Sequence, residues 1–463
     1  MREVEFDLLS VRPLKTLILW RGFPYVFQAL TLIAFLLLAY IGFGVFPTEG
    51  INAKLFAKSN LVTLVIWGLW WPAMIWTAVL AGRAWCMICP LEFVSNLSER
   101  LARRLGIEQR SLGQWLRSGA LMVLLYFAIQ MLVSGVGLHR VPAYTSFFLI
   151  GLLASAIVVG FVFKDRAFCR AFCPVGLLLN AYGRGGMLAV RPGSSAACSS
   201  CADKGCLIAS NRNKVDGRSC PSLLNPSRLN SNKDCLVCGQ CIKSCAPDNM
   251  QLVLRQPFPE KDAREPLASW PLTLFIMLAS GFVTSELTAE SSIAQAAFVW
   301  IPEHIADILR LSHYLGWLEG IWALVLFPAV LWLLLGGMIA LFRRTSIGDA
   351  WRRLALPIAV IVSAAHMSKA LAKFTSWAGF FPHALTDPLG TKTAMDIASH
   401  AVPSPEPLVN IHVASGIAFG LLLVGTLLAL REVRLANPTY LRVHAAPKFA
   451  LAGLFVIIIM AWG

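Results

Sequence analysis

The sequence predicts a polytopic α-helical membrane protein of about nine transmembrane helices, into which a small cysteine-rich cytoplasmic domain is inserted. Three observations predict this fold class. The 463 residues are 57% hydrophobic and 14% charged, whereas soluble domains carry about 25% charged residues. Apolar stretches of membrane-spanning length recur along the chain. Ten of the twelve cysteines fall in one polar segment between two of these stretches.

Nine apolar stretches approach or reach the ~17–25 residues that a helix needs to cross a bilayer. They are residues 23–45, 61–82, 118–137, 144–163, 269–289, 320–342, 355–377, 411–430 and, shortest of all, 447–462. Between the fourth and the fifth stretch, residues 164–266 form the one connecting segment long enough to fold as a domain. We therefore expect a membrane domain over 1–189, the cysteine-rich domain over 190–256 and a second membrane domain over 257–463.

Positive charge is distributed along the chain as membrane topology requires. The net charge is +15, and 33 of the 40 lysines and arginines lie in segments that are cytoplasmic if the N-terminus is inside. Cytoplasmic loops of membrane proteins carry such an excess of basic residues. The charge therefore indicates a multi-pass protein surrounded by the lipid of a bacterial cytoplasmic (inner) membrane, with the cysteine-rich domain on the cytoplasmic side. It does not indicate nucleic-acid binding.

The cysteine-rich segment contains a ferredoxin motif. The run 235-CLVCGQCIKSCAP-247 has the C-x2-C-x2-C-x3-C spacing of bacterial ferredoxins, in which the fourth cysteine ligates the neighbouring cluster. A partner run begins at 198-CSSCADKGC-206 and is completed by Cys220. Because cytoplasmic thiols stay reduced, metal or redox chemistry is expected here in place of structural disulfides.

These runs predict a bacterial-type two-cluster ferredoxin domain with two sets of ligands. The first [4Fe–4S] cluster is expected on the first set, Cys198, Cys201, Cys206 and Cys245. The other is expected on the second set, Cys220, Cys235, Cys238 and Cys241. Zinc is the alternative for C-x2-C pairs, but eight cysteines with one complete ferredoxin run favour clusters.

A further cysteine phrase occurs twice, each time directly after a pair of apolar stretches. The copies are 83-RAWCMICPLEFVSN-96 and 166-RAFCRAFCPVGLLLN-180. Parallel repeats in membrane proteins are related by an approximate two-fold axis along the membrane normal, so we expect both loops to meet at the cytoplasmic face. Their cysteines form the loop set, Cys86, Cys89, Cys169 and Cys173. A third metal centre, a redox dithiol and simple buried packing are the alternatives for this set.

Together these motifs resemble the NapH/NosR/CcoG-type membrane polyferredoxins over roughly residues 60–256. The resemblance rests on paired Cys-Pro loops after transmembrane helices, followed by the double ferredoxin motif. It implies electron transfer between the membrane quinone pool and another redox protein, or a role in assembling a metalloenzyme. The first loop departs from the family pattern, since it reads C-x2-C-P in place of C-x3-C-P. The flavin-binding module of NosR-type members is not expected, because the sequence shows no large extracytoplasmic N-terminal domain.

The seventh apolar stretch carries ionisable residues. His366, Lys369 and Lys373 stand at i, i+3 and i+7, so they share one helix face in the outer half of the expected span, and His412 opens the next span. Ionisable groups within membrane helices are costly and mark functional sites by default. A quinone site and a b-type haem on His366 and His412 are two alternatives. In a third, the lysines snorkel to the membrane surface and the histidine bonds a backbone carbonyl. We expect no chain of buried carboxylates of the kind that proton pumps use.

The sequence therefore predicts a membrane-bound iron–sulfur electron-transfer protein. Electrons would move between the quinone pool, or an extracytoplasmic redox partner protein, and [4Fe–4S] clusters at the cytoplasmic face. Two such clusters are the expected cofactors, while a third metal centre and a quinone or haem b stay open. No residue is predicted to be catalytic, and a role as part of a quinol-linked oxidoreductase stays open. The alternative is a maturation factor that reduces a metal or thiols during assembly of another enzyme.

Overall fold

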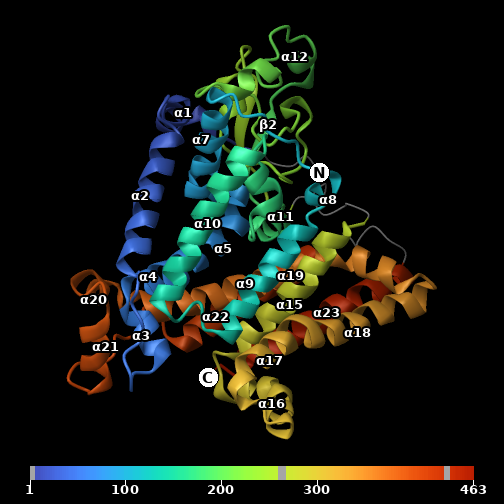
Figure 1. Cartoon of the computed structure of the whole chain (residues 1–463). Helices are drawn as coiled ribbons and strands as arrows, with labels where there is room; N and C mark the ends of the chain where they lie inside the picture. Colours follow the sequence, from blue (N-terminus) through green and yellow to red (C-terminus); the bar gives the residue numbers. More distant parts are fainter. Residues whose placement is uncertain (1–5, 259–266, 432–437, 463) are drawn as a thin grey trace. The chain divides into compact units, whose positions relative to one another are not determined.

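The computed structural model describes residues 6–258, 267–431 and 438–462. The chain is mainly helical and forms two compact units, each assembled from segments that alternate along the sequence. Unit 1 comprises residues 1–36, 77–122 and 150–264, and unit 2 comprises residues 37–76, 123–149 and 265–463. Four helices contribute residues to both units (Figure 1): α2 (Tyr25–Ile41), α5 (Trp71–Ala81), α9 (Ala120–Gly135) and α10 (Pro142–Val162).

Each of the nine expected spans coincides with an apolar helix. Within the described residues, six helices are long and apolar enough to cross a bilayer: Leu61–Arg104, Pro142–Val162, Trp270–Thr288, Ser312–Arg343, Ile347–Ala378 and Ile411–Ala429. Three shorter apolar helices of 10–17 residues complete the set: Tyr25–Ile41, Ala120–Gly135 and Ala445–Met460. The transmembrane helical class is thus confirmed, while the number of nine spans and the inside N-terminus stay predictions.

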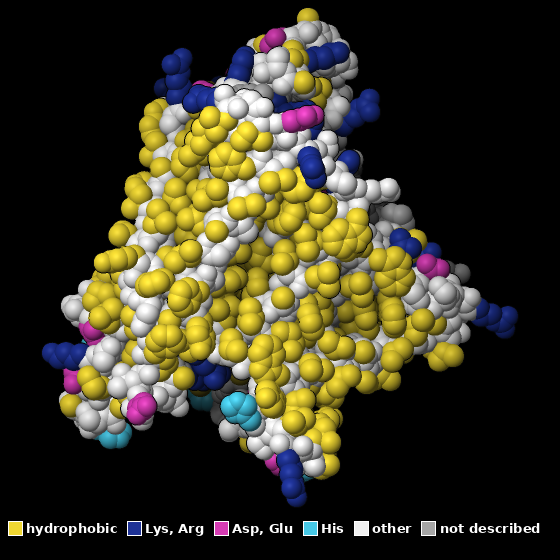
Figure 2. All heavy atoms as spheres, in the orientation of Figure 1, with side chains coloured by type: hydrophobic (Ala, Val, Ile, Leu, Met, Phe, Trp, Pro, Cys, Tyr) yellow, Lys and Arg dark blue, Asp and Glu magenta, His cyan; other side chains and the backbone are white. Residues whose placement is uncertain are grey.

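Apolar side chains cover the outward faces of these helices. On the face drawn in Figure 2, hydrophobic residues spread over the sides of the helices, and most of the lysines and arginines lie near the helix ends. On α18 (Phe327–Arg343), for example, Leu334 and Leu341 are 64% and 82% exposed. Such exposure would be costly in water but suits a helix that faces lipid.

Unit 1 is organised around a three-stranded antiparallel sheet with the strand order β1–β3–β2. Strand β3 (Met250–Leu254) pairs with β2 (Leu188–Pro192) along one edge and with β1 (Phe6–Asp7) along the other. The segment between β2 and β3 contains all eight cysteines of the two ferredoxin sets. Because these two strands are neighbours, the sheet closes this segment at its base.

Short helices lie between the strands of unit 1, and four of its cysteines, Cys86, Cys169, Cys198 and Cys241, fall on them. In chain order the helices are η1 (Leu8–Ser10), α1 (Arg12–Leu19), η3 (Gly82–Ala84), α6 (Trp85–Ile88), α7 (Pro90–Arg104), α8 (Gln114–Arg117), η4 (Phe168–Phe172), α11 (Gly176–Gly183), α12 (Ser195–Ser199), η5 (Ala209–Asn213), η6 (Pro226–Arg228) and α13 (Gln240–Lys243).

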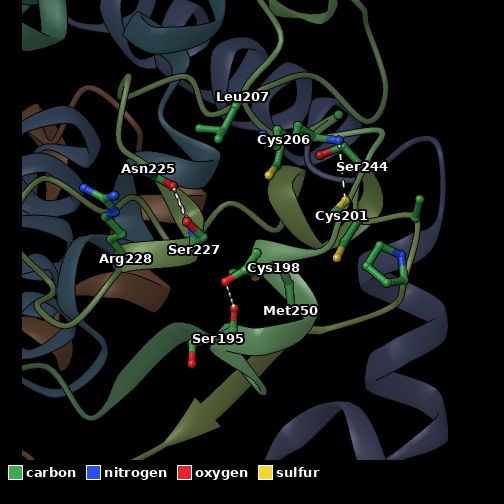
Figure 3. A pocket seen from close by; sticks show the side chains of 16 residues that line it. Ser195, Cys198, Cys201, Cys206, Leu207, Asn225, Ser227, Arg228, Ser244 and Met250 are labelled. Carbon is green, nitrogen blue, oxygen red and sulfur yellow. Dashed lines mark hydrogen bonds between the residues drawn. The ribbon is translucent and has the colours of Figure 1, made fainter.

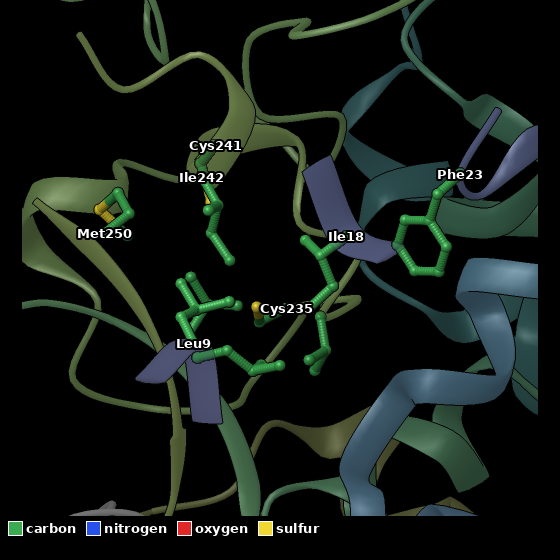
Figure 4. Close-up of a cluster of buried hydrophobic side chains, with 10 residues drawn as sticks. Leu9, Ile18, Phe23, Cys235, Cys241, Ile242 and Met250 are labelled. Atoms are coloured by element: carbon green, nitrogen blue, oxygen red, sulfur yellow. The ribbon is translucent and has the colours of Figure 1, made fainter. Parts of the chain in front are cut away.

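The N-terminal segment completes the core of the cysteine-rich part. Leu9, Ile18 and Phe23 join a buried cluster that includes Cys235 and Cys241 of the second set (Figure 4). Together with the β1–β3 pairing, this packing explains why residues 1–36 group with the cysteine-rich segment. The compact units therefore follow contacts, whereas the three ranges 1–189, 190–256 and 257–463 follow composition, and that three-part division stays a prediction.

Unit 2 is a helical bundle with α19 (Ile347–Ala378) at its centre. Within the described residues, α19 packs against α15 (Trp270–Thr288), α18, α22 (Ile411–Ala429) and α23 (Pro438–Met460) (Figure 1), and also against the π-helix η2 (Leu64–Trp70). Of the apolar window of α19, 94% is buried. A membrane helix that carries ionisable residues thus lies in the interior of its bundle.

The remaining elements of unit 2 are shorter. They are α3 (Ala53–Ser59), α4 (Leu61–Thr63), η2 (Leu64–Trp70), α16 (Ser292–Leu309), η7 (Ser312–Tyr314), α17 (Leu315–Ile321), η8 (Trp322–Leu326), α20 (Phe381–Thr386) and α21 (Thr391–Ala398).

Candidate functional site

The first cysteine set lines a pocket of about 380 Å³ (Figure 3). Cys198 lies on α12, whose N-cap Ser194 accepts a hydrogen bond from the Ala197 N–H. The Lys204 N–H donates to Cys201 Sγ over 3.4 Å, and Lys204 adopts a positive φ of 44° that turns the chain back toward the pocket. Cys206 and Cys245 complete the lining.

Hydrogen bonds from one residue connect the two ends of the ferredoxin motif. The Asn249 side chain donates to Cys198 Sγ over 3.2 Å, and the Asn249 backbone N–H donates to Cys245 Sγ over 3.3 Å. Burial raises the pKa of the Cys206 thiol, and the neighbouring charges of Cys245, Cys198 and Cys201 add to the effect. The structure therefore brings the four expected cysteines together, including Cys245 from the second run.

The second cysteine set lies deeper in unit 1. Cys235 and Cys241 are buried, each 8% exposed. Burial raises the pKa of Cys238 to about 12, against the opposing effect of Arg218, while Cys220 and Cys235 lie close enough to raise it further. Cys220, Cys235 and Cys238 likewise act on Cys241. These four thiols are mutual neighbours, as the crossed ligand pattern of two-cluster ferredoxins requires.

The unequal spacing of the two Cys-Pro loops is absorbed by a π-helix. In the second loop, η4 is a π-helix whose wider turn accommodates one additional residue, whereas the first loop forms the α-helical turn α6. Both loops end alike, because Cys89 has φ −68° and ψ 127° and Cys173 has φ −70° and ψ 115°. Proline follows each of them. The two loops thus present their second cysteine in the same backbone conformation despite the missing residue.

The loop set also gathers in one place. Cys89 lies within electrostatic reach of Cys169, Cys86 and Cys173. Burial, as the largest cause, raises the pKa of Cys169 to about 11 and that of Cys173 to about 12. The approximate two-fold repeat therefore brings together the four loop thiols that the sequence singled out.

The donor chemistry of the three sets fits iron–sulfur clusters. Each set offers four thiols, the ligand number of a [4Fe–4S] cluster, and the first set adds N–H donors to its sulfur atoms. Among the described residues, no three His, Cys, Asp or Glu side chains converge closely enough to hold a single metal ion. A [4Fe–4S] cluster does not require that convergence, because each thiolate binds a different iron.

A buried carboxylate that sequence reasoning missed lies beside the loop set. Glu92 is 2% exposed and accepts hydrogen bonds from Arg166 Nε over 3.0 Å and from Arg218 Nη2 over 3.1 Å. The sequence repeat could have pointed to Arg166 but not to its partner Glu92, since Arg166 and Arg83 occupy the same place before the first cysteine of each loop. Arg83 Nη1 forms its own ion pair with Asp234 over 3.4 Å.

In unit 2 the ionisable residues of α19 meet two glutamates. Lys369 Nζ lies 3.7 Å from Glu286 Oε2 and also donates a hydrogen bond to Glu290. His366 is 3% exposed, and its ring lies 5.9 Å from that of Phe282. Sequence reasoning expected no chain of buried carboxylates, and it missed this pair because both glutamates stand at the end of an apolar stretch.

Two of the residues grouped by sequence, Lys373 and His412, form no ion pair with the cluster of Lys369, Glu286 and Glu290 in the described part of the chain. Lys373 Nζ lies 5.3 Å from the ring centroid of Trp377. His412 is exposed in the first turn of α22. The Leu408 N–H donates to the Thr375 carbonyl, so this end of α22 is level with Thr375. Along the axis of α19, His366 is therefore about two helical turns, or ~12 Å, away from the level of His412. This separation is unfavourable for a single haem iron ligated by both histidines.

Comparison with known proteins points to the same cysteine loops. A family model described as a 4Fe-4S binding domain matches residues 63–108 and 146–191, which are the two repeats that contain the loop set. The ferredoxin-type protein NapH of Haemophilus influenzae is 29% identical over 178 residues, 36% of this chain and 61% of NapH. An uncharacterized protein of Methanocaldococcus jannaschii is 26% identical over 174 residues, 36% of this chain and 63% of that protein. No solved structure matches the chain.

These matches confirm the resemblance to NapH-type membrane polyferredoxins. The chain spans slightly less than two thirds of the length of the curated relatives. The family match supports [4Fe–4S] binding, and the six apolar helices of the described residues support a transmembrane protein.

Proposed function

We propose that this protein is a membrane-bound electron carrier that uses three [4Fe–4S] centres in series. The observation that carries the proposal is the order of the cysteine sets within unit 1. The charge of Arg166 acts on Cys169 of the loop set and on Cys238 of the second set. Cys206 of the first set in turn acts on Cys241 of the second set. Because electrons tunnel efficiently only between near neighbours, this order supports a relay from the loop set through the second set to the first.

Each cysteine set is proposed to ligate one cluster. The two ferredoxin sets follow the crossed pattern of bacterial ferredoxins, and the match of the family model to both repeats supports a cluster on the loop set. A bound cluster supplies a one-electron redox couple. The protein holds the thiols in place, excludes water from the buried Cys235 and Cys241 of the second set and donates N–H groups to sulfur at the first set. All three effects tune the reduction potential.

The exposed end of the relay is proposed to serve a redox partner protein. The cysteines of the first set are partly exposed, whereas Cys235 and Cys241 of the second set are buried. Lys204 and Arg228 line the same pocket and are exposed. Electrons would therefore enter or leave the relay at the first set, on the cytoplasmic side of a bacterial inner membrane.

The ion cluster of unit 2 is proposed as the quinone site. The His366 ring lies 6.4 Å from the Trp71 ring and 5.9 Å from the Phe282 ring, centroid to centroid, an aromatic setting that suits a planar ring. Oxidation of a quinol to a quinone releases two electrons and two protons. His366, Glu286 and Glu290 would accept the protons, and the electrons would pass one at a time to the cysteine sets.

Iron and acid-labile sulfide, measured on anaerobically purified full chain, test the proposal. About twelve irons per chain, four per cysteine set, are expected. A double substitution of Cys169 and Cys173 by alanine should lower this to about eight and stop reduction of the remaining clusters by a quinol analogue. A wild-type value of about eight would remove the loop centre. Clusters that quinol cannot reduce would instead favour a maturation factor.

A further inference from the structure

A buried ion-pair junction joins the loop set to the second set. Glu92 Oε1 accepts from Arg166 Nε over 3.0 Å and from Arg218 Nη2 over 3.1 Å, and Glu92 Oε2 accepts from Gln28 Nε2 over 2.7 Å. The four side chains are between 2% and 6% exposed. In sequence, Glu92 follows Cys89 by three residues, Arg166 precedes Cys169 by three and Arg218 precedes Cys220 by two.

The junction carries one more positive than negative charge. Two buried guanidinium groups share a single carboxylate, although burying ions is expensive unless they are fully paired. Arg166 Nη2 and Arg218 Nε are buried and have no hydrogen-bond partner within the described residues. A buried donor without a partner is costly, so the junction calls for an acceptor or an anion that the described residues do not supply.

Both cysteine sets lie within electrostatic reach of this positive charge. Arg166 acts on Cys169 and Cys86 of the loop set and on Cys238 of the second set, and Arg218 also acts on Cys238. Thiolate-bound clusters carry negative charge and offer sulfur atoms as hydrogen-bond acceptors. They therefore supply what the two buried guanidinium groups lack.

The repeat provides a second connection of the same kind. Arg83, the counterpart of Arg166 in the first loop, lies within electrostatic reach of Cys86. Its guanidinium pairs with Asp234, the residue directly before Cys235. Both repeat arginines thus bridge the loop set and the second set, which a packing role in one loop alone would not require.

We propose that Glu92 is a positioning residue for the electron step between the loop set and the second set. It holds Arg166 and Arg218 as fixed cations between the two centres, where they favour the reduced state of each. The inference rests on the proposed relay and names the residues that set its potentials. In the step, the donor centre is oxidised by one electron and the acceptor centre is reduced by one, while no bond or proton moves.

The test is an EPR-monitored redox titration of the full chain in detergent, with iron and sulfide measured on each sample. Arg166→Gln removes a cation and should lower the midpoint potentials of both centres. Glu92→Gln removes the anion but keeps a side-chain oxygen that can accept from both guanidinium groups, so it should raise the potentials. Arg166→Lys keeps the charge and should recover most of the loss. Arg103→Gln is the matched control, because Arg103 pairs with Glu99 on the same helix α7 over 2.8 Å and should leave both potentials unchanged.

Opposite shifts in Arg166→Gln and Glu92→Gln support the proposal, since a purely structural role would make both variants lose clusters alike. Unchanged potentials in both, or shifts of the same sign, overturn it. If Arg166→Gln loses its iron, the potentials of Glu92→Gln and Arg166→Lys are compared instead. A raised potential in Glu92→Gln beside a nearly wild-type potential in Arg166→Lys supports the proposal, and an unchanged or lowered potential in Glu92→Gln overturns it. If the wild-type loop set binds no cluster, the relay fails, yet the opposite shifts at the second set still decide the role of the junction.

Discussion

The side-chain amide N–H of Asn249 donates a hydrogen bond over 3.2 Å to Sγ of Cys198, which lies at the opposite end of the ferredoxin motif. Hydrogen bonds to cluster sulfurs raise the reduction potential, because they stabilise the more negative reduced state. We predict that Asn249→Ala lowers the midpoint potential of the first-set centre and leaves the second-set centre unchanged. An EPR-monitored titration of the two signals measures both.

Asn225→Ala is the matched control for that substitution. Asn225 lines the same pocket, but its side chain accepts hydrogen bonds from Ser227. It should therefore leave both potentials at the wild-type value. Equal shifts in the two variants would show that polarity of the pocket, and not the N–H···S bond, sets the potential.

The crossing of Cys245 to the first set can be tested by two cysteines of one run. We predict that Cys245→Ala disturbs the first-set centre and Cys241→Ala disturbs the second-set centre, because Cys245 lines the first-set pocket whereas Cys241 lies among the second-set thiols. EPR and Mössbauer spectra of the reduced variants would distinguish the two centres. Loss of the same spectral component in both variants would contradict the crossed assignment.

Sequence spacing could predict the cysteine sets because cluster ligation depends on local runs of a few residues. Cys235, Cys238 and Cys241 belong to one such run, and their set needs only one distant member. The repeat predicted that the two loops meet, although the C-x2-C spacing left their geometry unequal. Spacing alone could not reveal the π-helix at 168–172, since a π-turn has no simple residue signature.

Partners that come from distant segments could not be predicted in the same way. Glu92 pairs with Arg166 and Arg218, 74 and 126 residues away. In the sequence, Glu286 is simply a residue at the end of an apolar stretch. Its ion pair with Lys369 forms because α15 packs against α19. Such ion pairs depend on which helices pack together, and one sequence does not contain that information.

Lys369 should be the most sensitive ionisable residue of unit 2. Its side chain is 8% exposed and pairs with both Glu286 and Glu290. We predict that Lys369→Met lowers the free energy of unfolding by about 3 kcal/mol, the low end for breaking a buried pair, because the two glutamates keep about a quarter of their exposure. Thermal unfolding in detergent measures the loss.

Lys373→Met provides the comparison on the same helix face. Lys373 lies over the Trp377 ring, a contact worth about 0.5–1 kcal/mol at exposed sites, so this variant should be destabilised much less. The triple variant Lys369→Met, Glu286→Gln, Glu290→Gln should recover part of the loss, since it leaves no unpaired charge. A triple variant less stable than Lys369→Met would show that the glutamates stabilise unit 2 through other contacts.

Gly281 sets how closely α15 approaches the π-helix η8. A Cβ at this position would lie 2.0 Å from the Ala323 carbonyl oxygen and 2.9 Å from Pro328 Cδ, and both of those atoms belong to rigid backbone or ring. We predict that Gly281→Ala destabilises unit 2 by about 1–3 kcal/mol through overpacking. Gly337→Ala on α18, where a Cβ meets open space, should instead stabilise its helix by up to about 1 kcal/mol.

Because Gly281 and Glu286 share α15, displacement of this helix in Gly281→Ala should also abolish quinol-dependent reduction of the clusters. Equal unfolding temperatures for the two glycine variants would show that α15 and η8 separate without cost.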